Sequence, residues 1–423
     1  MCTSRREFLN QIAAISILAG GTASAAPLGN NMSPNLQQEE PSDNVRAFFS
    51  RLVYTRQDVD DWLAERRYPF DRYDAELGYL LRNARFRDGL GGRTSTYTYV
   101  GRGERKMINC ADCPCRINTY GDSFTECHQV SDGETWQEAL AAHFGEPVRN
   151  FGIGGYSVYQ AYLRMLREEK RTPAPYIIFN IFLDDHIRTL VPWQAIRFPK
   201  TETAFRPSLP HMTVDLATGE CTKQPNPCPT EESLYNLCDL DWLIEQFADN
   251  LTARMMMGSL AQTENNPDAA YKAIVELTTT HGVSPSEDLS DRVDLEAVEI
   301  VRGAGMIASM NIVEWVEDYA RTNNKKVLWV LSYPGLTVGK FLHTRERWDR
   351  AFVEFMNRKG VALVDLMEEH EADYANFKGT PEDYIKQYFY GHYNPQGNFF
   401  HAFALREKLV EMLDPKPPAY QAS

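Results

Sequence analysis

Residues 116–125 read Arg116-Ile-Asn-Thr-Tyr-Gly-Asp-Ser-Phe-Thr125, a pattern that predicts a short strand running directly into a tight turn that carries Ser123. In α/β folds, ligands bind beyond the ends of such strands. The helix expected after the turn leaves free N–H groups there, and these favour negative charge. Gly, Asp and Ser are ordinary turn residues, so the triplet alone is weak support for catalysis.

From residue 116 onward, short apolar strands alternate with amphipathic helices. The predicted strands are 116–120, 148–152, 176–183, 327–332 and 361–366, and the predicted helices are 136–144, 157–169, 295–321, 346–359 and 398–413. This alternation predicts one parallel sheet with helices on both faces. Ser123, Gly155, Asp184 and Ser332 each lie just past a strand end, so we expect them along the same edge of the sheet.

Two further segments accompany this domain, which is expected to span 116–415 before a tail at 416–423. An N-terminal extension, 45–115, begins with helical patterns over 45–52 and 59–66 and continues to a strand over 94–100. An insertion at about 189–290 contains a hairpin-like run, 212–219, a Cys-rich and Pro-rich run, 221–228, and helical patterns over 240–257 and 269–280. It is expected either to form a lid or substrate wall or to be a stabilising decoration.

The N-terminus has the pattern of an export signal over residues 1–25. Arg5 and Arg6 precede Phe8-Leu9, an apolar run follows over 12–19, and Ala23-Ser24-Ala25 resembles a small-residue cleavage site. Paired arginines are typical of the twin-arginine type, and an ordinary secretory signal is the alternative. Residues 26–44 form a polar leader that is expected to be disordered. The predicted location of the protein is therefore periplasmic or secreted.

Composition limits the functional classes. The chain has 423 residues, of which 43% are hydrophobic and 24% charged, an ordinary globular balance. Its net charge of −14 argues against nucleic acid as a partner, because nucleic-acid binders carry a basic surface. No apolar run reaches the roughly 18 residues that span a bilayer, so no stable membrane insertion is expected after signal cleavage.

The cysteines form two clusters, Cys110, Cys113 and Cys115 in one and Cys221, Cys228 and Cys238 in the other. Cys127 stands by itself, and Cys2 would leave with the signal. In an oxidising compartment this arrangement predicts disulfides. Zinc binding is disfavoured because Cys-x-x-Cys-x-Cys lacks a second spaced pair, and free structural thiols are the remaining alternative. We expect no metal and no cofactor, since the chain lacks the glycine fingerprint of a nucleotide-binding unit.

Three more motifs are expected near Ser123. Tyr390-Gly-His-Tyr-Asn-Pro-Gln-Gly397 places His392 just before the last helix, and Asn150-Phe-Gly-Ile-Gly-Gly155 offers backbone N–H groups after the second strand. The third strand ends in Leu183-Asp-Asp-His186. Each motif has a structural alternative: the glycine loop can be only a tight turn, and His392 can be a surface or capping residue. Their joint order and spacing favour a catalytic site.

In these motifs the chain, from residue 116 to its C-terminus, resembles the SGNH/GDSL hydrolase superfamily. The resemblance implies a three-layer α/β/α, flavodoxin-like fold with a central parallel sheet. It implies that Ser123 is the nucleophile and His392 the general base. The oxyanion hole implied by the resemblance comprises the backbone N–H groups of Ser123 and Gly155 and the residue at Asp184, where the superfamily has an asparagine.

The sequence departs from the superfamily at two positions. An ionised Asp184 would repel an oxyanion, so either its carboxyl is protonated or it has another role, such as orienting a neighbour, and the amide of Gly152 or Gly154 compensates. The acid that usually lies two or three residues before the histidine is also missing. We expect His392 to rely on a backbone carbonyl or on a remote acid, for which the candidates are Asp365 and Asp383. The histidines at 128 and 186 are expected to be structural.

The sequence thus predicts an exported serine esterase that hydrolyses, without a cofactor, acetyl or related esters of small molecules or glycans. Two alternatives use the same scaffold. An O-acyltransferase would pass the acyl group to an extracytoplasmic glycan, and a carbohydrate-binding protein without catalysis would explain the two departures from the superfamily.

Overall fold

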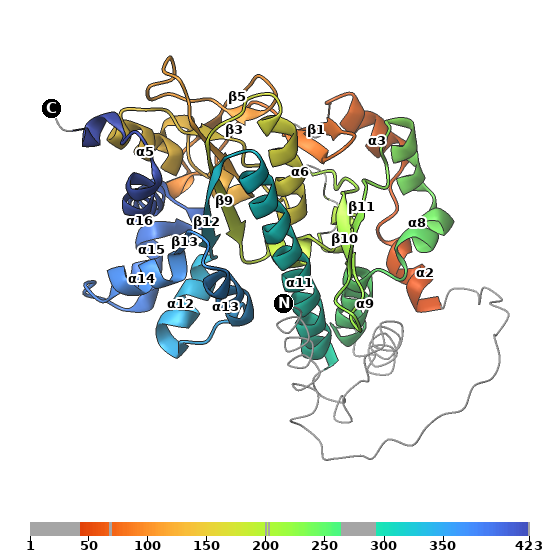
Figure 1. Cartoon of the computed structure of the whole chain (residues 1–423). Helices are drawn as coiled ribbons and strands as arrows, with labels where there is room; N and C mark the ends of the chain where they lie inside the picture. The colour runs from red at the N-terminus through yellow and green to blue at the C-terminus, as the bar shows by residue number, and fades with distance from the viewer. Residues whose placement is uncertain (1–42, 67–69, 199–200, 202–203, 264–292, 422–423) are drawn as a thin grey trace.

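A seven-stranded sheet forms the centre of the computed structural model, which describes residues 43–66, 70–198, 201, 204–263 and 293–421 (Figure 1). Its strands lie in the order β13-β12-β9-β7-β8-β6-β5. Their bounds are β5 Tyr99–Val100, β6 Glu104–Arg105, β7 Ile117–Tyr120, β8 Arg149–Asn150, β9 Tyr176–Phe182, β12 Lys326–Ser332 and β13 Leu363–Asp365. Neighbours from β13 to β8 are parallel, whereas β6 and β5 are antiparallel. The predicted parallel sheet is confirmed from β13 to β8, whereas the antiparallel strands β6 and β5 at its edge were not predicted.

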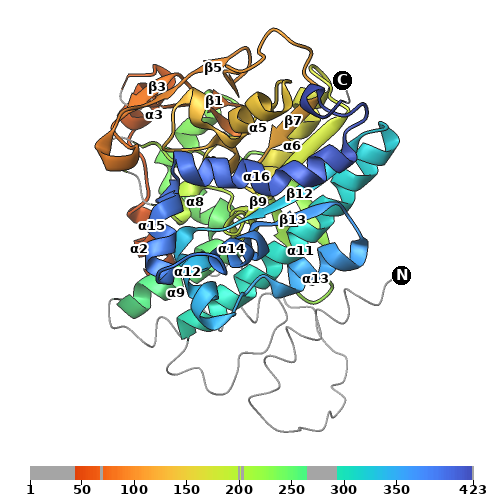
Figure 2. The same ribbon diagram turned by 90° about the vertical axis from the view of Figure 1, so that its left-hand side faces the viewer.

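Helices cover both faces of this sheet (Figures 1 and 2). One face carries α5 (Trp136–Phe144), α14 (Leu366–Tyr374) and α16 (Pro395–Met412), and the other carries α6 (Val158–Glu169) and α11 (Val293–Thr322). Figure 2 looks onto the first of these faces. Because β9 and β12 are covered on both sides, they read as almost continuous apolar runs. The fold is therefore mixed α/β, as predicted.

Capping residues explain where the predicted helix boundaries hold. The side chain of Thr135 accepts a hydrogen bond from the backbone of Glu138, and Gly145 ends α5 in a left-handed conformation, so the predicted bounds are confirmed. α16 begins three residues before the predicted start, because Asn394 caps it and Pro395 occupies its first turn. The sequence patterns did not predict α12 (Gly335–Thr344), α14 or α15 (Pro381–Tyr388), and α13 (Arg350–Lys359) begins four residues after its predicted start at 346.

The N-terminal extension is part of the central fold rather than an attachment to it. Its strands β5 and β6 complete the sheet next to β8. The extension also contains α2 (Asp43–Ser50), α3 (Arg56–Leu63), β1 (Asp71–Asp74), β2 (Gly78–Leu81), β3 (Ala84–Phe86) and β4 (Ser95–Tyr97). The predicted boundary at residue 115 therefore does not separate two structural units.

The insertion packs against the extension in a second hydrophobic core. The predicted hairpin is confirmed as β10 (His211–Val214) paired with β11 (Cys221–Gln224), and the helical run as α8 (Leu240–Phe247) and α9 (Leu251–Thr263). Trp62 and Phe205, one from each segment, stack with ring centroids 4.3 Å apart. Ile153 and Tyr156 of the glycine loop belong to the same core. This second core supports the glycine loop.

The remaining predictions concern the N-terminal segments, the cysteines, metal binding and membrane insertion. The predicted signal 1–25, the leader 26–44 except for its last two residues, and the helical pattern 269–280 lie outside the described residues. In the part of the chain that the structure describes, the expected disulfides of the first cluster are not formed, and the following cysteines carry free thiols: Cys110, Cys113, Cys115, Cys127 and Cys228. Within the described ranges no cluster of side chains is suited to hold a metal ion. No helix there is long and apolar enough to span a membrane.

Candidate active site

Ser123 is the first residue of α4 (Ser123–Glu126), directly after the turn that follows β7. The turn requires Gly121, whose φ is +153°, since a Cβ there would meet the backbone oxygen of Asn180 at 2.6 Å. Asp122 caps the helix by accepting a hydrogen bond of 2.9 Å from the backbone N–H of Phe124. The predicted succession of strand, turn and serine is confirmed.

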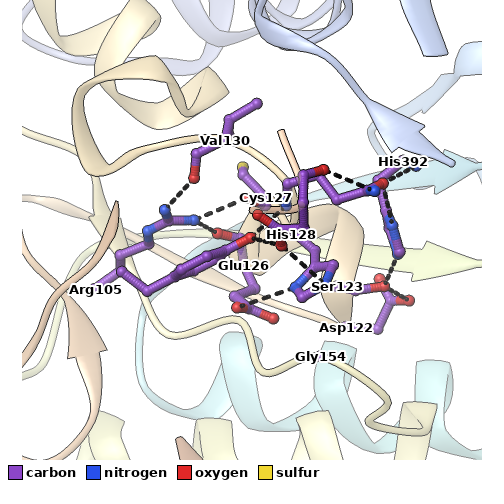
Figure 3. A network of polar contacts seen from close by, with 12 residues as sticks. Arg105, Asp122, Ser123, Glu126, Cys127, His128, Val130, Gly154 and His392 are labelled. Carbon is purple, nitrogen blue, oxygen red and sulfur yellow. Dashed lines mark hydrogen bonds and ion pairs between the residues drawn. The ribbon is translucent and has the colours of Figure 1, made fainter. Parts of the chain in front are cut away.

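The structure brings Ser123 and His392 together, although they are 269 positions apart in the sequence (Figure 3). The Oγ atom of Ser123 lies 2.8 Å from Nε2 of His392, within hydrogen-bond distance. His392 stands in the short strand β15 (His392–Tyr393), which pairs with β14 (Phe389–Tyr390) just before α16. Asp122 Oδ2 offers a second acceptor to the Ser123 hydroxyl, at 3.2 Å.

The other side of the His392 ring meets an amide instead of a carboxylate. Gln129 Oε1 accepts hydrogen bonds from the backbone N–H of His392, at 2.7 Å, and from Nδ1, at 3.2 Å. The amide cannot be reversed, because its Nε2 donates to the backbone oxygen of Asp88 at 3.1 Å and the backbone N–H of His392 needs an acceptor. Nδ1 therefore carries the proton. Nε2 is left with the lone pair that accepts from Ser123.

An unusual loop conformation brings Gln129 to this position. Cys127 and Gln129 both have left-handed backbone conformations, with φ of 65° and 72°. Such conformations cost non-glycine residues about 1 kcal/mol or more each, so the surrounding contacts must hold them in place. Gly391 provides the room on the other side, since a Cβ there would lie 2.6 Å from Gln129 Oε1.

Neither acid candidate from the sequence contacts His392. Asp365 caps α14 and forms an ion pair of 2.7 Å with Nη1 of Arg347. Asp383 accepts one hydrogen bond of 3.2 Å from the hydroxyl of Thr380, on an exposed part of α15 (Pro381–Tyr388). Within the described part of the chain, no hydrogen bond or ion pair joins either carboxylate to the His392 ring. The residue that orients the imidazole is Gln129, and no motif marks it in the sequence.

Burial lowers the pKa of His392 to about 3. The neighbouring charge of His128 acts in the same direction, Glu126 raises the pKa, and Arg188 lowers it. The imidazole is therefore neutral at neutral pH. Neutral imidazole is the form that can accept a proton from a serine hydroxyl.

A second histidine, predicted to be structural, stands beside the first. The ring centroids of His128 and His392 are 5.1 Å apart at an angle of 68° (Figure 3). His128 lies between two carboxylates, with Nδ1 3.8 Å from Glu126 Oε1 and Nε2 3.6 Å from Asp88 Oδ2. Burial lowers the pKa of His128, but the two carboxylates outweigh it, so the net shift is upward. His186 does fit a structural role, because it is buried with Nδ1 2.8 Å from Ser309 Oγ.

The conformation of the glycine loop holds the backbone N–H of Gly155 in a fixed direction and leaves it available as a donor. The hydroxyl of Tyr79 donates to the backbone oxygen of Gly154 at 2.6 Å. In a trans peptide the carbonyl and the following N–H point in opposite directions, so this bond fixes the Gly155 N–H. Within the described residues the N–H groups of Ser123, Gly154 and Gly155 have no hydrogen-bond partner. The N–H of Gly152 is occupied, since it donates to Asn150 Oδ1 at 2.9 Å.

Asp184 is not a donor in this structure. Its carboxylate accepts one hydrogen bond of 2.9 Å from Arg188 and two, of 2.9 and 3.0 Å, from Arg197. Burial raises the pKa of Asp184, but the two arginines outweigh it and the net shift is downward. An ionised carboxylate cannot stabilise an oxyanion directly. Of the two roles expected from the sequence, orienting a neighbour is the one that this geometry fits.

The site thus combines a serine hydroxyl, a neutral imidazole oriented by an amide, and backbone N–H groups without partners. This combination has the parts required for acyl transfer through a covalent serine intermediate. Tyr79, Gln129 and Arg188 were not among the predicted site residues. No protein-family model and no curated protein matches the chain.

Proposed function

We propose that this chain is a serine esterase of the SGNH/GDSL type. The observation that carries the proposal is the distance of 2.8 Å between Ser123 Oγ and His392 Nε2, with the tautomer of His392 fixed by Gln129. The mixed α/β fold, with a mostly parallel sheet and the serine just past β7, is compatible with that superfamily. The unpartnered N–H groups of Ser123 and Gly155 provide the oxyanion site.

In the first half of the reaction, His392 Nε2 takes the proton of Ser123 as Oγ attacks the ester carbonyl carbon. The π electrons of the carbonyl move to its oxygen, and the oxyanion accepts hydrogen bonds from the N–H groups of Ser123 and Gly155. When the intermediate collapses, the bond to the alcohol breaks and the alcohol leaves with the proton from His392. An acyl group then remains on Ser123.

In the second half, water attacks the acyl carbon while His392 accepts a proton from it, and the acid leaves as Ser123 recovers its hydrogen. Gln129 is neutral, so it orients the imidazole through its oxygen but stabilises the imidazolium less than a carboxylate would. Glu126, which lies beyond His128, contributes negative charge at longer range. We therefore expect an active but modest catalyst.

The proposed substrates are acetyl or similar esters, on small molecules or glycans outside the cytoplasm. The resemblance of the motifs and the signal-like N-terminus support this choice. The test is hydrolysis of p-nitrophenyl acetate and of acetylated sugars by the purified chain, with Ser123→Ala expected to abolish turnover.

The matched control is Ser332→Ala, at the carboxyl end of β12, two strands away from β7, which removes a buried hydroxyl that has no hydrogen-bond partner among the described residues. It is expected to retain full activity. Activity that survives Ser123→Ala, or the absence of any hydrolysis by the wild-type chain, would contradict the proposal. Transfer of acetyl to an added sugar in place of release as acetate would assign the acyltransferase alternative.

A further inference from the structure

Arg188 ends the short helix α7 (Asp185–Arg188), which follows β9. Three carboxylates hold its guanidinium group. Nε donates to Asp184 at 2.9 Å, and Nη1 donates to Asp185 at 2.9 Å and to Asp122 at 3.2 Å. A guanidinium held by two adjacent carboxylates and by a third from the turn before Ser123 has little freedom to move, and it stays charged.

The third nitrogen, Nη2, has no hydrogen-bond partner within the described residues. Nη2 is also not one of the buried side-chain atoms that lack a partner, so part of its surface is accessible to solvent. The Arg188 side chain keeps 17% of its surface exposed, while Nε and Nη1 face the carboxylates. Nη2 is therefore the donor that Arg188 presents on its open side.

A shared carboxylate places this guanidinium beside the nucleophile. Asp122 Oδ2 lies 3.2 Å from Arg188 Nη1 and 3.2 Å from Ser123 Oγ, so it joins the two groups. Burial raises the pKa of Tyr79 and lowers that of His392, and the positive charge of Arg188 acts to lower both. Tyr79 in turn donates a hydrogen bond to the backbone oxygen of Gly154. Arg188 is thus one carboxylate away from Ser123.

We propose that Arg188 is a catalytic residue, whose Nη2 donates a third hydrogen bond to the oxyanion beside the N–H groups of Ser123 and Gly155. This inference rests on the proposed esterase function. A cation fixed before the reaction stabilises charge that develops on the oxygen without having to reorganise. Asp184 then has a positioning role: it holds Arg188 and leaves the donation of the hydrogen bond to the guanidinium.

The same nitrogen can instead bind an anionic group of the bound substrate. Kinetics distinguish these roles. Removing an interaction made only in the transition state lowers kcat and leaves KM unchanged, whereas removing an interaction made with the ground state raises KM. Neutral p-nitrophenyl acetate is the right substrate for the test, because it has no anionic group for Arg188 to bind.

The test is Arg188→Lys, which keeps the positive charge but replaces the rigid fork of donors with a single ammonium group. We expect kcat on p-nitrophenyl acetate to fall about 10²- to 10³-fold with KM little changed. Labelling of Ser123 by a fluorophosphonate should slow by a similar factor, since phosphonylation also places an oxygen at the oxyanion site. The matched control is Arg347→Lys, an arginine that also bridges buried carboxylates but lies beside β13, three strands away from β7.

A second variant, Arg188→Gln with Asp185→Asn, removes one charge of each sign and so limits the destabilisation if the lysine variant does not fold. Circular dichroism and the melting temperature establish folding. A folded Arg188 variant with kcat within threefold of wild type, or with a change in KM alone, would overturn the inference while the esterase function stands. A wild-type chain that neither hydrolyses the ester nor labels with the probe would instead overturn the proposed function, and the inference with it.

Discussion

Two arginines of this protein are held by aspartates near the carboxyl ends of strands in the same sheet, yet their surroundings differ. Every side-chain nitrogen of Arg347 is occupied, with Nε bound to Asp349, Nη1 to Asp365, and Nη2 to Asp349 and Tyr333. Its side chain is 9% exposed, against 17% for Arg188. Within the described residues, Nη2 of Arg188 has no hydrogen-bond partner. An ion cluster becomes a candidate for catalysis where such a polar atom remains available beside a nucleophile.

The comparison also explains why Asp365 is not the acid partner of His392. Asp365 is the last residue of β13, and it lies in the closed cluster around Arg347. Its carboxylate balances that guanidinium and caps α14. Because Asp365 both pairs with Arg347 and caps α14, it contributes to the stability of the fold. The group that accepts the hydrogen bond from Nδ1 of His392 is the amide of Gln129, in a loop close to Ser123.

The largest effect is expected from Arg347→Met. This change leaves Asp349 and Asp365 buried without their cation, which typically costs about 3–5 kcal/mol of folding free energy. We expect a large drop in the melting temperature, measured by calorimetry, and a kcat of the folded protein close to wild type. A fall in kcat as large as that expected for Arg188→Lys would mean that the closed cluster also serves the reaction.

A smaller effect is expected from Tyr79→Phe, at the glycine loop. The change removes the hydrogen bond to Gly154 and frees the peptide that presents the Gly155 N–H. One neutral hydrogen bond contributes about 0.5–1.5 kcal/mol, so kcat on p-nitrophenyl acetate should fall up to about tenfold with little change in KM. Tyr73→Phe, which removes a hydroxyl bonded to the backbone of Cys228, is the control and should leave kcat unchanged. Equal effects of the two changes would contradict the positioning role of Tyr79.

The smallest expected effect is on the pH dependence of the wild-type enzyme. Because the pKa of His392 is lowered to about 3, kcat/KM should stay nearly constant from pH 7 to about pH 4.5 wherever circular dichroism shows the fold intact. Gln129→Glu places a carboxylate at Nδ1 and should move the acidic limb to higher pH, because the negative charge favours the imidazolium. A limb near pH 6.5 in the wild type would show that His392 is not buried among these charges in solution.

Local signals predicted much of the fold and the central pair of the site. Ser123 and His392 stand in short motifs next to elements with clear periodicity, and caps such as Thr135 mark the helix ends. The sheet positions of β5 and β6 could not be predicted, since two-residue strands carry no periodic signal. Arg188 and Gln129 reach the site only through contacts that the folded chain creates. Their residue types and sequence neighbours are ordinary.

The most direct test of the central claim is the mass of the intact protein after incubation with a fluorophosphonate. We predict a single covalent adduct that maps to Ser123, is lost in Ser123→Ala, and forms much more slowly in His392→Ala because the hydroxyl has then lost its base. An adduct of unchanged rate in His392→Ala, or no adduct on the folded wild-type chain, would contradict the account of Ser123 as an activated nucleophile.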